Sequence, residues 1–399
     1  MDGATDTRIY DEIDPATPVN LHPRRLARMA PLLAAAAVAV ALLIAFLPFR
    51  PGDGDEGAAG PVSWLPSRLT PAKAPPPLPA DRGVGPASLI YLTAGGPQAV
   101  LVTVTGSQYR LPDTGPRSLS PDGRWLLSVR DKRLILRDLT GTEVRDLGSE
   151  IAVGAFSAVW STDGAELVIQ QDQMRNAPPY DRATVVDLAL GQSSTVPLVQ
   201  FTGTSVCGVQ GNGDLVLCPG RFDRRDLRTW VVDGVTGQLR SQHTMELMDV
   251  LEPSERRGEE VAGQLGDWQL ALADGLTLAL RAHDYVPEQG VTTPGDLLLV
   301  DVATGKFVRR LELPTQAVVG IGESGGSQRF ATTEGRRVVA AAPEGVLLVH
   351  SGPLGSTGGD RFVEIVRALE LLDPVTGKRT VVTKVSGSIA AVIPRGANL

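Results

Sequence analysis

The pattern of hydrophobic and polar positions divides the chain into two regions with different predicted structures. From Met29 to Phe49 the sequence has 21 uncharged residues with no polar stripe, which predicts a helix of about 31 Å at about 1.5 Å per residue. Beyond Ser88, short apolar runs alternate with turn residues, a pattern typical of β-strands. We therefore expect one transmembrane helix over residues 29–49 and an all-β domain over residues 88–399.

The charges beside the apolar segment predict its orientation in a cell membrane. Arg24, Arg25 and Arg28 precede the segment, and an excess of basic residues marks the cytoplasmic side of a membrane helix. We expect a cytoplasmic N-terminus and an extracytoplasmic C-terminal domain. Because 28 residues precede the apolar segment and no small-x-small site follows it, an uncleaved signal anchor is expected rather than a removed signal peptide.

Two further segments have compositions that do not favour a packed core. Residues 1–28 are rich in charge and poor in apolar groups, so we expect a disordered cytoplasmic tail. Residues 50–87 contain nine prolines in 38 positions, which favours extended polyproline II structure. We expect this segment to be an extracytoplasmic linker that holds the β domain away from the membrane.

A recurring turn motif indicates that the β domain is built from repeats. Apolar runs are followed by the pattern Asp-x-x-Thr-Gly, or a variant of it, at residues 103–106, 138–141, 187–191, 233–237, 301–305 and 373–377. The Asp side chain of such a turn accepts backbone N–H groups, and the Gly adopts the left-handed conformation that completes the hairpin. The number of repeats predicts a β-propeller of about six four-stranded blades, with seven as the alternative.

A second motif occurs earlier in two of the repeats, as Ser120-Pro121-Asp122-Gly123 and as Ser161-Thr162-Asp163-Gly164. These motifs resemble the WSPDG repeat of the TolB-type, WD40-like bacterial β-propellers. The resemblance covers residues 88–399 and implies a binding platform in the cell envelope. Related propellers carry quinone cofactors or a hydrolase domain, but neither addition is evident in this sequence, and no cofactor is expected.

The ends of the β domain are expected to close the ring. Residues 389–393 form an apolar strand after the last repeat, whereas the first repeat, at residues 89–92, lacks an inner strand. The two could complete one blade together. Such closure protects sheet edges that would otherwise pair with another molecule.

The two cysteines flank a predicted hairpin turn. If Asn212-Gly213 is a two-residue type I′ turn, the register places Cys207 directly opposite Cys218. Opposed residues lie within disulfide reach, and an outer compartment permits oxidation. We expect a disulfide, with two buried thiols as the alternative. No histidine lies near either cysteine, so a metal site is not expected.

One motif suggests catalysis but lacks the required context. Residues 322–326 match the Gly-x-Ser-x-Gly nucleophile elbow, and His350 follows in the chain order of a hydrolase triad. The elbow requires a helix after the serine, whereas residues 327–335 are polar and rich in turn residues. We therefore interpret the motif as a glycine-rich hairpin loop and expect neither a catalytic residue nor a metal ligand.

The long insertions of the repeats are the expected binding surface. They fall between the second and third strands of each unit, at residues 171–182, 219–227, 281–295 and 351–361, and equivalent loops of a propeller share one face. Tyr180, Arg224, Arg225 and Tyr285 are the expected anchors, because aromatic and Arg side chains dominate many interfaces. The alternative is that these surface loops merely tolerate insertions.

Together these features predict a non-catalytic, membrane-tethered binding or scaffolding module. The net charge is only −7 with both signs interspersed, which does not indicate nucleic-acid binding. The expected partner is a protein, peptide or glycan of the envelope, and the expected state is a monomer. The alternatives are a propeller enzyme, such as a hydrolase, lyase or quinoprotein, and a sensor that signals through the helix.

Overall fold

The computed structural model describes residues 62–397 with internal gaps. The gaps are residues 95–97, 113–114, 116, 132, 151–155, 172–180, 202, 220–225, 247–255, 258–259, 262–263, 266–276, 287–290, 302–303, 314–317, 325–326, 333–334 and 357–361. The chain divides into two compact units, Met1–Ala58 and Ala59–Leu399, and the described residues belong to the second. The predicted tail (1–28) and transmembrane helix (29–49) lie outside them. Within the described part, no helix has the length and apolar character needed to cross a membrane.

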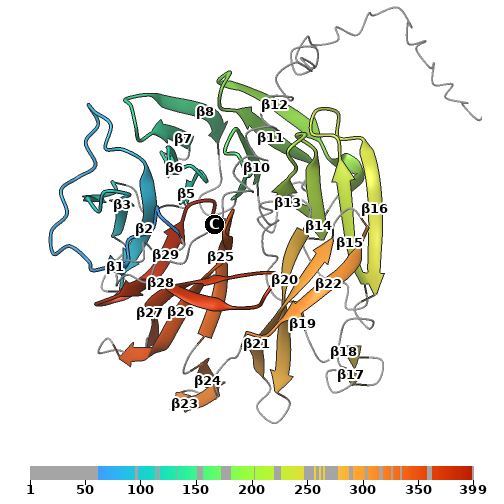
Figure 1. The fold of residues 1–399 in the computed structure, drawn as a ribbon. Coiled ribbons are helices and arrows are strands. Elements are labelled where there is room, and N and C mark those ends of the chain that lie inside the picture. The colour runs from blue at the N-terminus through green and yellow to red at the C-terminus, as the bar shows by residue number, and fades with distance from the viewer. Residues whose placement is uncertain are drawn as a thin grey trace, which may run out of the picture. The chain divides into compact units, whose positions relative to one another are not determined.

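The described residues form sheets arranged around a central axis (Figure 1). Sheet 1 has the order β29 (Ile389–Pro394), β2 (Ala87–Thr93), β3 (Ala99–Thr103) and β4 (Gln108–Arg110). Sheet 2 consists of β5 (Arg117–Leu119), β6 (Trp125–Arg130), β7 (Arg133–Asp138) and β8 (Val144–Glu150). Sheet 3 consists of β9 (Phe156–Trp160), β10 (Glu166–Gln171), β11 (Arg182–Asp187) and β12 (Gln192–Pro197).

The second half of the ring has the same organisation. Sheet 4 consists of β13 (Thr204–Val209), β14 (Leu215–Pro219), β15 (Asp226–Val232) and β16 (Leu239–Glu246). Sheet 5 consists of β19 (Gln264–Leu265), β20 (Thr277–Val286), β21 (Val291–Asp301) and β22 (Lys306–Leu311). Sheet 6 consists of β25 (Gly335–Ala342), β26 (Gly345–Ser356), β27 (Phe362–Leu372) and β28 (Arg379–Val385), with β1 (Arg68–Leu69) added beside β28.

Smaller elements come between these sheets along the chain. They are the two-stranded pairs β17 (Arg256–Arg257) with β18 (Glu260–Val261) and β23 (Val318–Ser324) with β24 (Ser327–Thr332), and the 3-10 helix η2 (Val199–Phe201). The all-β propeller prediction is therefore confirmed, but the blade prediction needs correction. Instead of six or seven four-stranded blades, the described residues contain five sheets of four strands, and sheet 6 has five. The extra strand comes from residues before the repeats, which carry no turn motif that could reveal it.

Hydrophobic side chains fill the spaces between neighbouring sheets and hold the ring together. One buried cluster joins sheets 1 and 2, a second joins sheets 2 and 3, and a third joins sheets 3 and 4. Two more join sheet 5 to sheet 6 and sheet 6 back to sheet 1. Sheets 4 and 5 meet where the Gly305 turn approaches His243 so closely that an added Cβ would lie 2.4 Å from the His243 Cβ.

The C-terminal strand closes the ring as the apolar run predicts. Strand β29 pairs antiparallel with β2, with Ile393 opposite Ile90 and Val392 opposite Tyr91. Strand β29 therefore supplies the inner strand that the first repeat lacks. In Figure 1 the red β29 lies beside the blue β2, so the two ends of the propeller sequence meet in one sheet.

Residues 62–86 form a strap that packs against the ring, contrary to the linker prediction. Val62, Leu65 and Leu69 belong to the buried cluster between sheets 6 and 1. Leu69 pairs in parallel with Val385 of β28, and a parallel bridge joins Pro77 to Arg110 of β4. The prolines favour an extended backbone, but the apolar residues between them bury against the ring, so the segment from residue 62 onward belongs to the folded unit and is not a free linker.

The Asp-x-x-Thr-Gly motifs form the turns between the third and fourth strands. The Asp138 carboxylate accepts the backbone N–H of Thr140 at 2.8 Å, and the Asp373 carboxylate accepts that of Val375 at 2.7 Å. At Gly237, with φ +69°, the backbone N–H donates to the Asp233 carbonyl at 2.9 Å. The structural role predicted for these residues is confirmed.

Asp233 should make the stability of the fold vary with pH in the acidic range. Burial alone would raise the pKa of its carboxyl, but N–H groups of Thr236 and Val235 and the guanidinium of Arg240 lower that pKa to about 2. The Asp233 side chain is only 6% exposed. Since the pKa is below the unfolded value of about 3.9, the ionised carboxylate stabilises the fold above about pH 4, and this contribution is lost as the pH falls towards 2.

Replacement of Asp233 by Asn is therefore expected to lower the free energy of unfolding by about 1–2 kcal/mol at pH 7. The deficit should shrink between pH 4 and pH 2, because the wild-type carboxyl becomes protonated there. Urea denaturation of the full chain in detergent at pH 7, 4 and 2 measures the difference. A deficit of the same size at pH 2 would show that the charge is not responsible.

Candidate binding site

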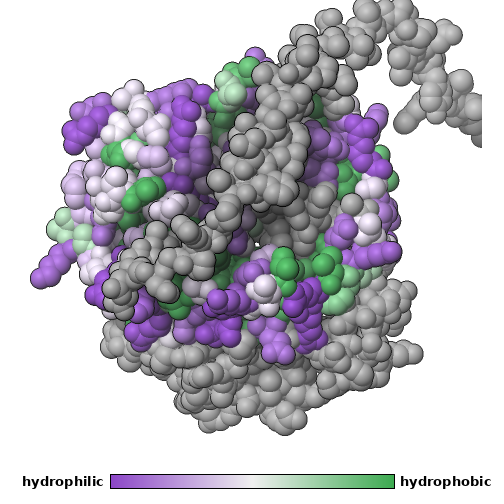
Figure 2. All heavy atoms as spheres, in the orientation of Figure 1, coloured by the Kyte–Doolittle hydropathy of each residue, from purple (hydrophilic) through white to green (hydrophobic). Residues whose placement is uncertain are grey.

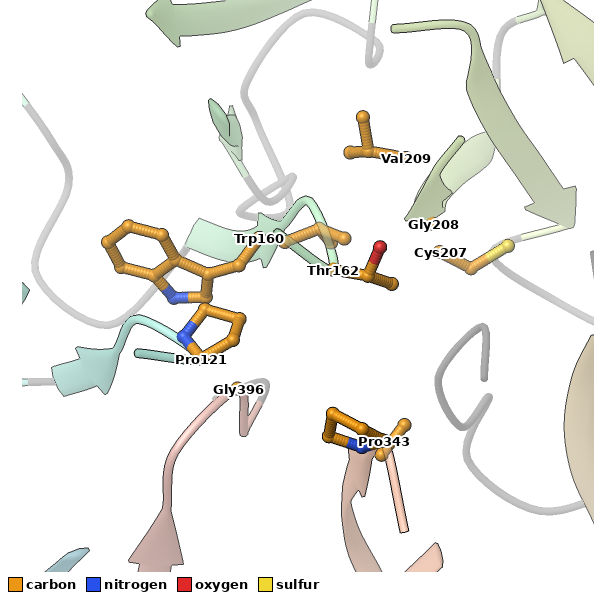
Figure 3. A pocket seen from close by; sticks show the side chains of 10 residues that line it. Pro121, Trp160, Thr162, Cys207, Gly208, Val209, Pro343 and Gly396 are labelled. Atoms are coloured by element: carbon orange, nitrogen blue, oxygen red, sulfur yellow. The ribbon is translucent and has the colours of Figure 1, made fainter. Parts of the chain in front are cut away.

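A small hollow lies at one end of the inner strands of the ring, which we call the mouth of the ring. Its lining comes from the inner strands, or the turns that follow them, in sheets 1, 2, 3, 4 and 6. The residues are Pro121, Val159, Trp160, Thr162, Cys207, Gly208, Val209, Ala341, Pro343 and Gly396. Figure 3 shows Trp160 and Pro121 on one side of the hollow and Pro343 on another.

The second sequence motif builds two of the turns at this mouth. In the first copy, Ser120 Oγ accepts the backbone N–H of Trp125 at 2.8 Å. In the second copy, Ser161 Oγ accepts that of Glu166 at 2.8 Å. These bonds fix the tight turns that carry Pro121 and Thr162 to the hollow. The sequence thus contains a signal for part of the site, although we used this motif only for the resemblance to the TolB-type propellers.

The wall formed by Trp160 is held in place by the C-terminal segment. Its indole Nε1 donates to Ser118 Oγ at 2.6 Å, and Ser118 Oγ donates to the Ala397 carbonyl at 2.9 Å. The backbone N–H of Gly396 donates to the Leu119 carbonyl at 2.9 Å. Because the Trp160 donor is already satisfied, this residue presents an apolar ring surface rather than a hydrogen-bond donor.

The lining has the chemistry of a binding pocket for an apolar group. It contains two prolines, a tryptophan, two valines and an alanine, and none of its residues is Asp, Glu, His, Lys or Arg. Among the described residues, no group of three or more His, Cys, Asp and Glu side chains could hold a metal ion. Hollows with mostly apolar walls and few polar groups bind apolar ligand groups by excluding water.

The two cysteines form a disulfide beside this hollow, but their register differs from the prediction. Cys207 is bonded to Cys218, with the Cα atoms 6.2 Å apart. Cys218 pairs with Ser205, and the register shifts between Val206 and Gly208, so Cys207 is the extra residue of a β-bulge. The predicted direct opposition of the cysteines is therefore wrong. The turn carries a third residue, because the N–H of Gln210 donates to the Asp214 carbonyl at 2.9 Å, which leaves residues 211–213 in the loop.

The Cys207 sulfur atom does not face the hollow. The Cys207 sulfur points away from the hollow in Figure 3, and Cys207 is only 5% exposed. The disulfide thus fixes the strand that carries Gly208 and Val209 at the hollow, and it does not offer its sulfur atoms to a ligand.

The predicted binding anchors are not brought to this hollow by any described contact. Tyr180, Arg224 and Arg225 lie outside the described residues. Tyr285 lies on β20, where only the backbone is described. The strand ends that flank the insertions belong to the second and third strands and lie at the opposite end of the sheets from the hollow, because successive hairpins of a meander alternate ends. The anchors therefore remain predictions.

Two of these insertions contain strands rather than only loops. Strands β20 and β21 remain paired out to Val286 opposite Val291. Strands β26 and β27 remain paired out to Ser356 opposite Phe362. The described parts of these insertions, residues 281–286 with 291–295 and residues 351–356, thus extend hairpins of sheets 5 and 6 beyond the length of the other strands.

The possible nucleophile elbow does not have the required backbone. Ser324 ends β23 and is followed by β24, with Ser324 opposite Ser327, so a hairpin replaces the helix that the elbow needs. His350 lies on β26, where its Nδ1 is 3.3 Å from Glu370 Oε1. Arg336 Nε donates to the other Glu370 oxygen at 2.9 Å. The interpretation of the motif as a hairpin loop is supported, and His350 belongs to a cross-strand polar cluster.

Comparisons with known proteins give only distant similarities. No protein-family model matches the chain, and no curated protein matches it. Among solved structures, the chain is similar to hydrazine synthase of Kuenenia stuttgartiensis, with a TM-score of 0.41 and 15% identity over 81% of this chain and 88% of that chain. It is also similar to a structure described as TolB from Agrobacterium tumefaciens, with a TM-score of 0.41 and 14% identity over 77% and 92%. Function must therefore be argued from the residues of the site.

Proposed function

We propose that this protein is a membrane-tethered β-propeller that binds a protein or peptide partner in the cell envelope without catalysing a reaction. The observation that carries the proposal is the hollow at the mouth of the ring, whose lining is mostly apolar and comes from the inner strands and turns of several sheets. An apolar side chain of a partner fits such walls, because burying it removes hydrocarbon surface from water. The two Ser-x-Asp-Gly turns at this mouth also support a place among the TolB-type propellers.

The extracytoplasmic location is part of the proposal. It is supported by the uncharged segment from Met29 to Phe49 with arginines before it. The Cys207–Cys218 disulfide is consistent with an oxidising compartment. Protease added outside intact cells, or to spheroplasts if an outer membrane is present, tests this location. If the propeller is protected from the protease, the location is contradicted.

The proposed binding mode can be tested with variants that fill the hollow. Thr162 lies at the hollow and is exposed, so Thr162→Arg adds bulk and charge there without disturbing the core. Thr195→Arg is a matched control, because Thr195 is exposed on β12 at the outer side of the same sheet. The probe is an array of unstructured Gly-Ser peptides that each contain a single Leu, Ile, Phe or Trp, beside peptides with none.

We expect the wild-type chain in detergent to bind peptides that contain an apolar residue. Thr162→Arg should weaken that binding at least tenfold, whereas Thr195→Arg should leave it unchanged. Equal binding by both variants would overturn the assignment of the hollow. Binding to an oligosaccharide array with no binding to any peptide would overturn the choice of a protein or peptide partner.

A further inference from the structure

The strap pairs with the outer edges of some sheets and leaves other outer edges without a partner strand among the described residues. Strand β1 of the strap pairs in parallel with the outer strand β28 of sheet 6, through Arg68 with Lys384 and Leu69 with Val385. The strap also bridges the outer strand β4 of sheet 1. In the described part of the chain, β22 ends its sheet with no strand beside it. The strap thus shows that edges of these sheets accept an extended segment.

Strand β22 exposes an apolar surface at its edge. Phe307 is 39% exposed and Val308 is 56% exposed, although consecutive residues of a strand normally point to opposite faces. The register shifts here, with Val300 opposite Phe307 and Leu299 opposite Arg309, so Val308 is the extra residue of a bulge. By contrast, the outer strand β12 exposes polar residues over Gln192–Thr195.

Strand β22 is also basic. Lys306 and Arg309 are exposed, and Arg310 is partly exposed. Arg309 lies close enough to Asp373 in the neighbouring turn to lower the pKa of that carboxyl, although the hydrogen bonds from Thr376 and Val375 contribute more. The edge therefore combines two apolar side chains with three cationic ones. Figure 2 shows that, on the face in view, hydrophobic groups occur among hydrophilic residues in small separate areas.

We propose that β22 accepts an extended acidic segment of another protein as an additional strand of sheet 5. Backbone N–H and C=O groups at a sheet edge supply the pairing, and side chains on alternate positions supply specificity. Apolar residues of the added segment would cover Phe307 and Val308, and its carboxylates would face Lys306 and the arginines. A second copy of this chain fits poorly, because two β22 strands would place cationic residues against each other.

This interaction is independent of the hollow, and a defined probe tests it. The probe is a fluorescent peptide of alternating acidic and branched apolar residues, Asp-Ile-Glu-Val-Asp-Ile-Glu, compared with a peptide that has Lys at each acidic position. We expect the full chain in detergent to bind the acidic peptide at least tenfold more tightly than the basic one. Binding should weaken as salt increases, because exposed charges are screened.

A pair of variants separates this edge from general surface effects. Val308→Asp removes exposed apolar surface and adds a repelling charge, and it should weaken binding of the acidic peptide at least tenfold. Val381→Asp is the matched control: Val381 is 49% exposed on β28, a strand of another sheet that already pairs with β1 at Lys384 and Val385. Both positions are exposed, so both variants should keep the wild-type melting temperature within a few degrees. Equal loss of binding in both variants, or no loss in either, would overturn the proposal.

Hydrogen exchange distinguishes strand addition from simple charge attraction. An added strand should slow exchange of backbone amides in residues 306–311 when the peptide is bound, because its carbonyl groups accept them. The amides of residues 192–197 on β12 should exchange as before. Binding of the peptide with no added protection in residues 306–311 would overturn strand addition.

Discussion

A chain that ends at Ser388 is expected to lose the cooperative unfolding transition of the propeller. This truncation removes β29, whose Ile389 and Val392 are 0% and 1% exposed. Each such side chain contributes about 1.5–3 kcal/mol when fully buried. The truncation also exposes the inner edge of β2 and the buried face of Tyr91, which is opposite Val392. The combined loss is comparable with the whole stability of about 5–15 kcal/mol that folded domains possess.

The expected result can be measured by thermal unfolding of the full-length and truncated chains in detergent, followed by near-ultraviolet circular dichroism and by limited proteolysis. The control is a chain that ends at Ala397, which keeps β29, the bond from Gly396 to Leu119 and the bond from Ser118 to Ala397. We expect the control to melt like the full-length chain and the Ser388 truncation to be cleaved throughout the ring. A cooperative transition in the truncated chain would show that β29 does not close the ring.

Much of this architecture could be predicted because each repeat carries a short sequence motif of its own. Each Asp-x-x-Thr-Gly turn contains both the carboxylate that accepts the N–H groups and the residues that donate them, as at Asp373 and Val375. Strand β29 was predictable because an apolar run remained after the last repeat and an inner strand was missing from the first. The pairing of β29 with β2, which are far apart in the sequence, could be inferred only because the first repeat lacked one strand and one apolar strand remained after the last repeat.

Other features could not be predicted. They depend on contacts between residues far apart in the sequence, or on one inserted residue. Nothing near Cys207 signals the β-bulge that shifts Cys218 opposite Ser205. The hollow combines Pro121, Trp160 and Pro343 with Gly396, and only the closed ring brings these together. The strap was missed for the same reason, since the partner of Leu69 is Val385 and no repeat pattern links them.

The Leu69→Ala variant is expected to lower the free energy of unfolding by about 2–5 kcal/mol, the usual range for truncating a buried leucine. Leu69 is 1% exposed and belongs to the same buried cluster as Tyr91, Val382 and Ile389. Its carbonyl accepts the N–H of Ser386 at 2.9 Å, so the strap stays paired at this point and the cavity left by the side chain is not easily filled. A free linker would give no change at all.

Thermal and urea unfolding of the full chain in detergent measure this effect, and the strap itself provides the control. Lys73 is exposed, so Lys73→Ala should change the free energy of unfolding by less than about 0.5 kcal/mol. If Leu69→Ala behaves like Lys73→Ala, the strap does not stabilise the ring. If only Leu69→Ala destabilises it, the segment next to the predicted membrane anchor is part of the propeller. The predicted linker is then shortened to residues 50–61.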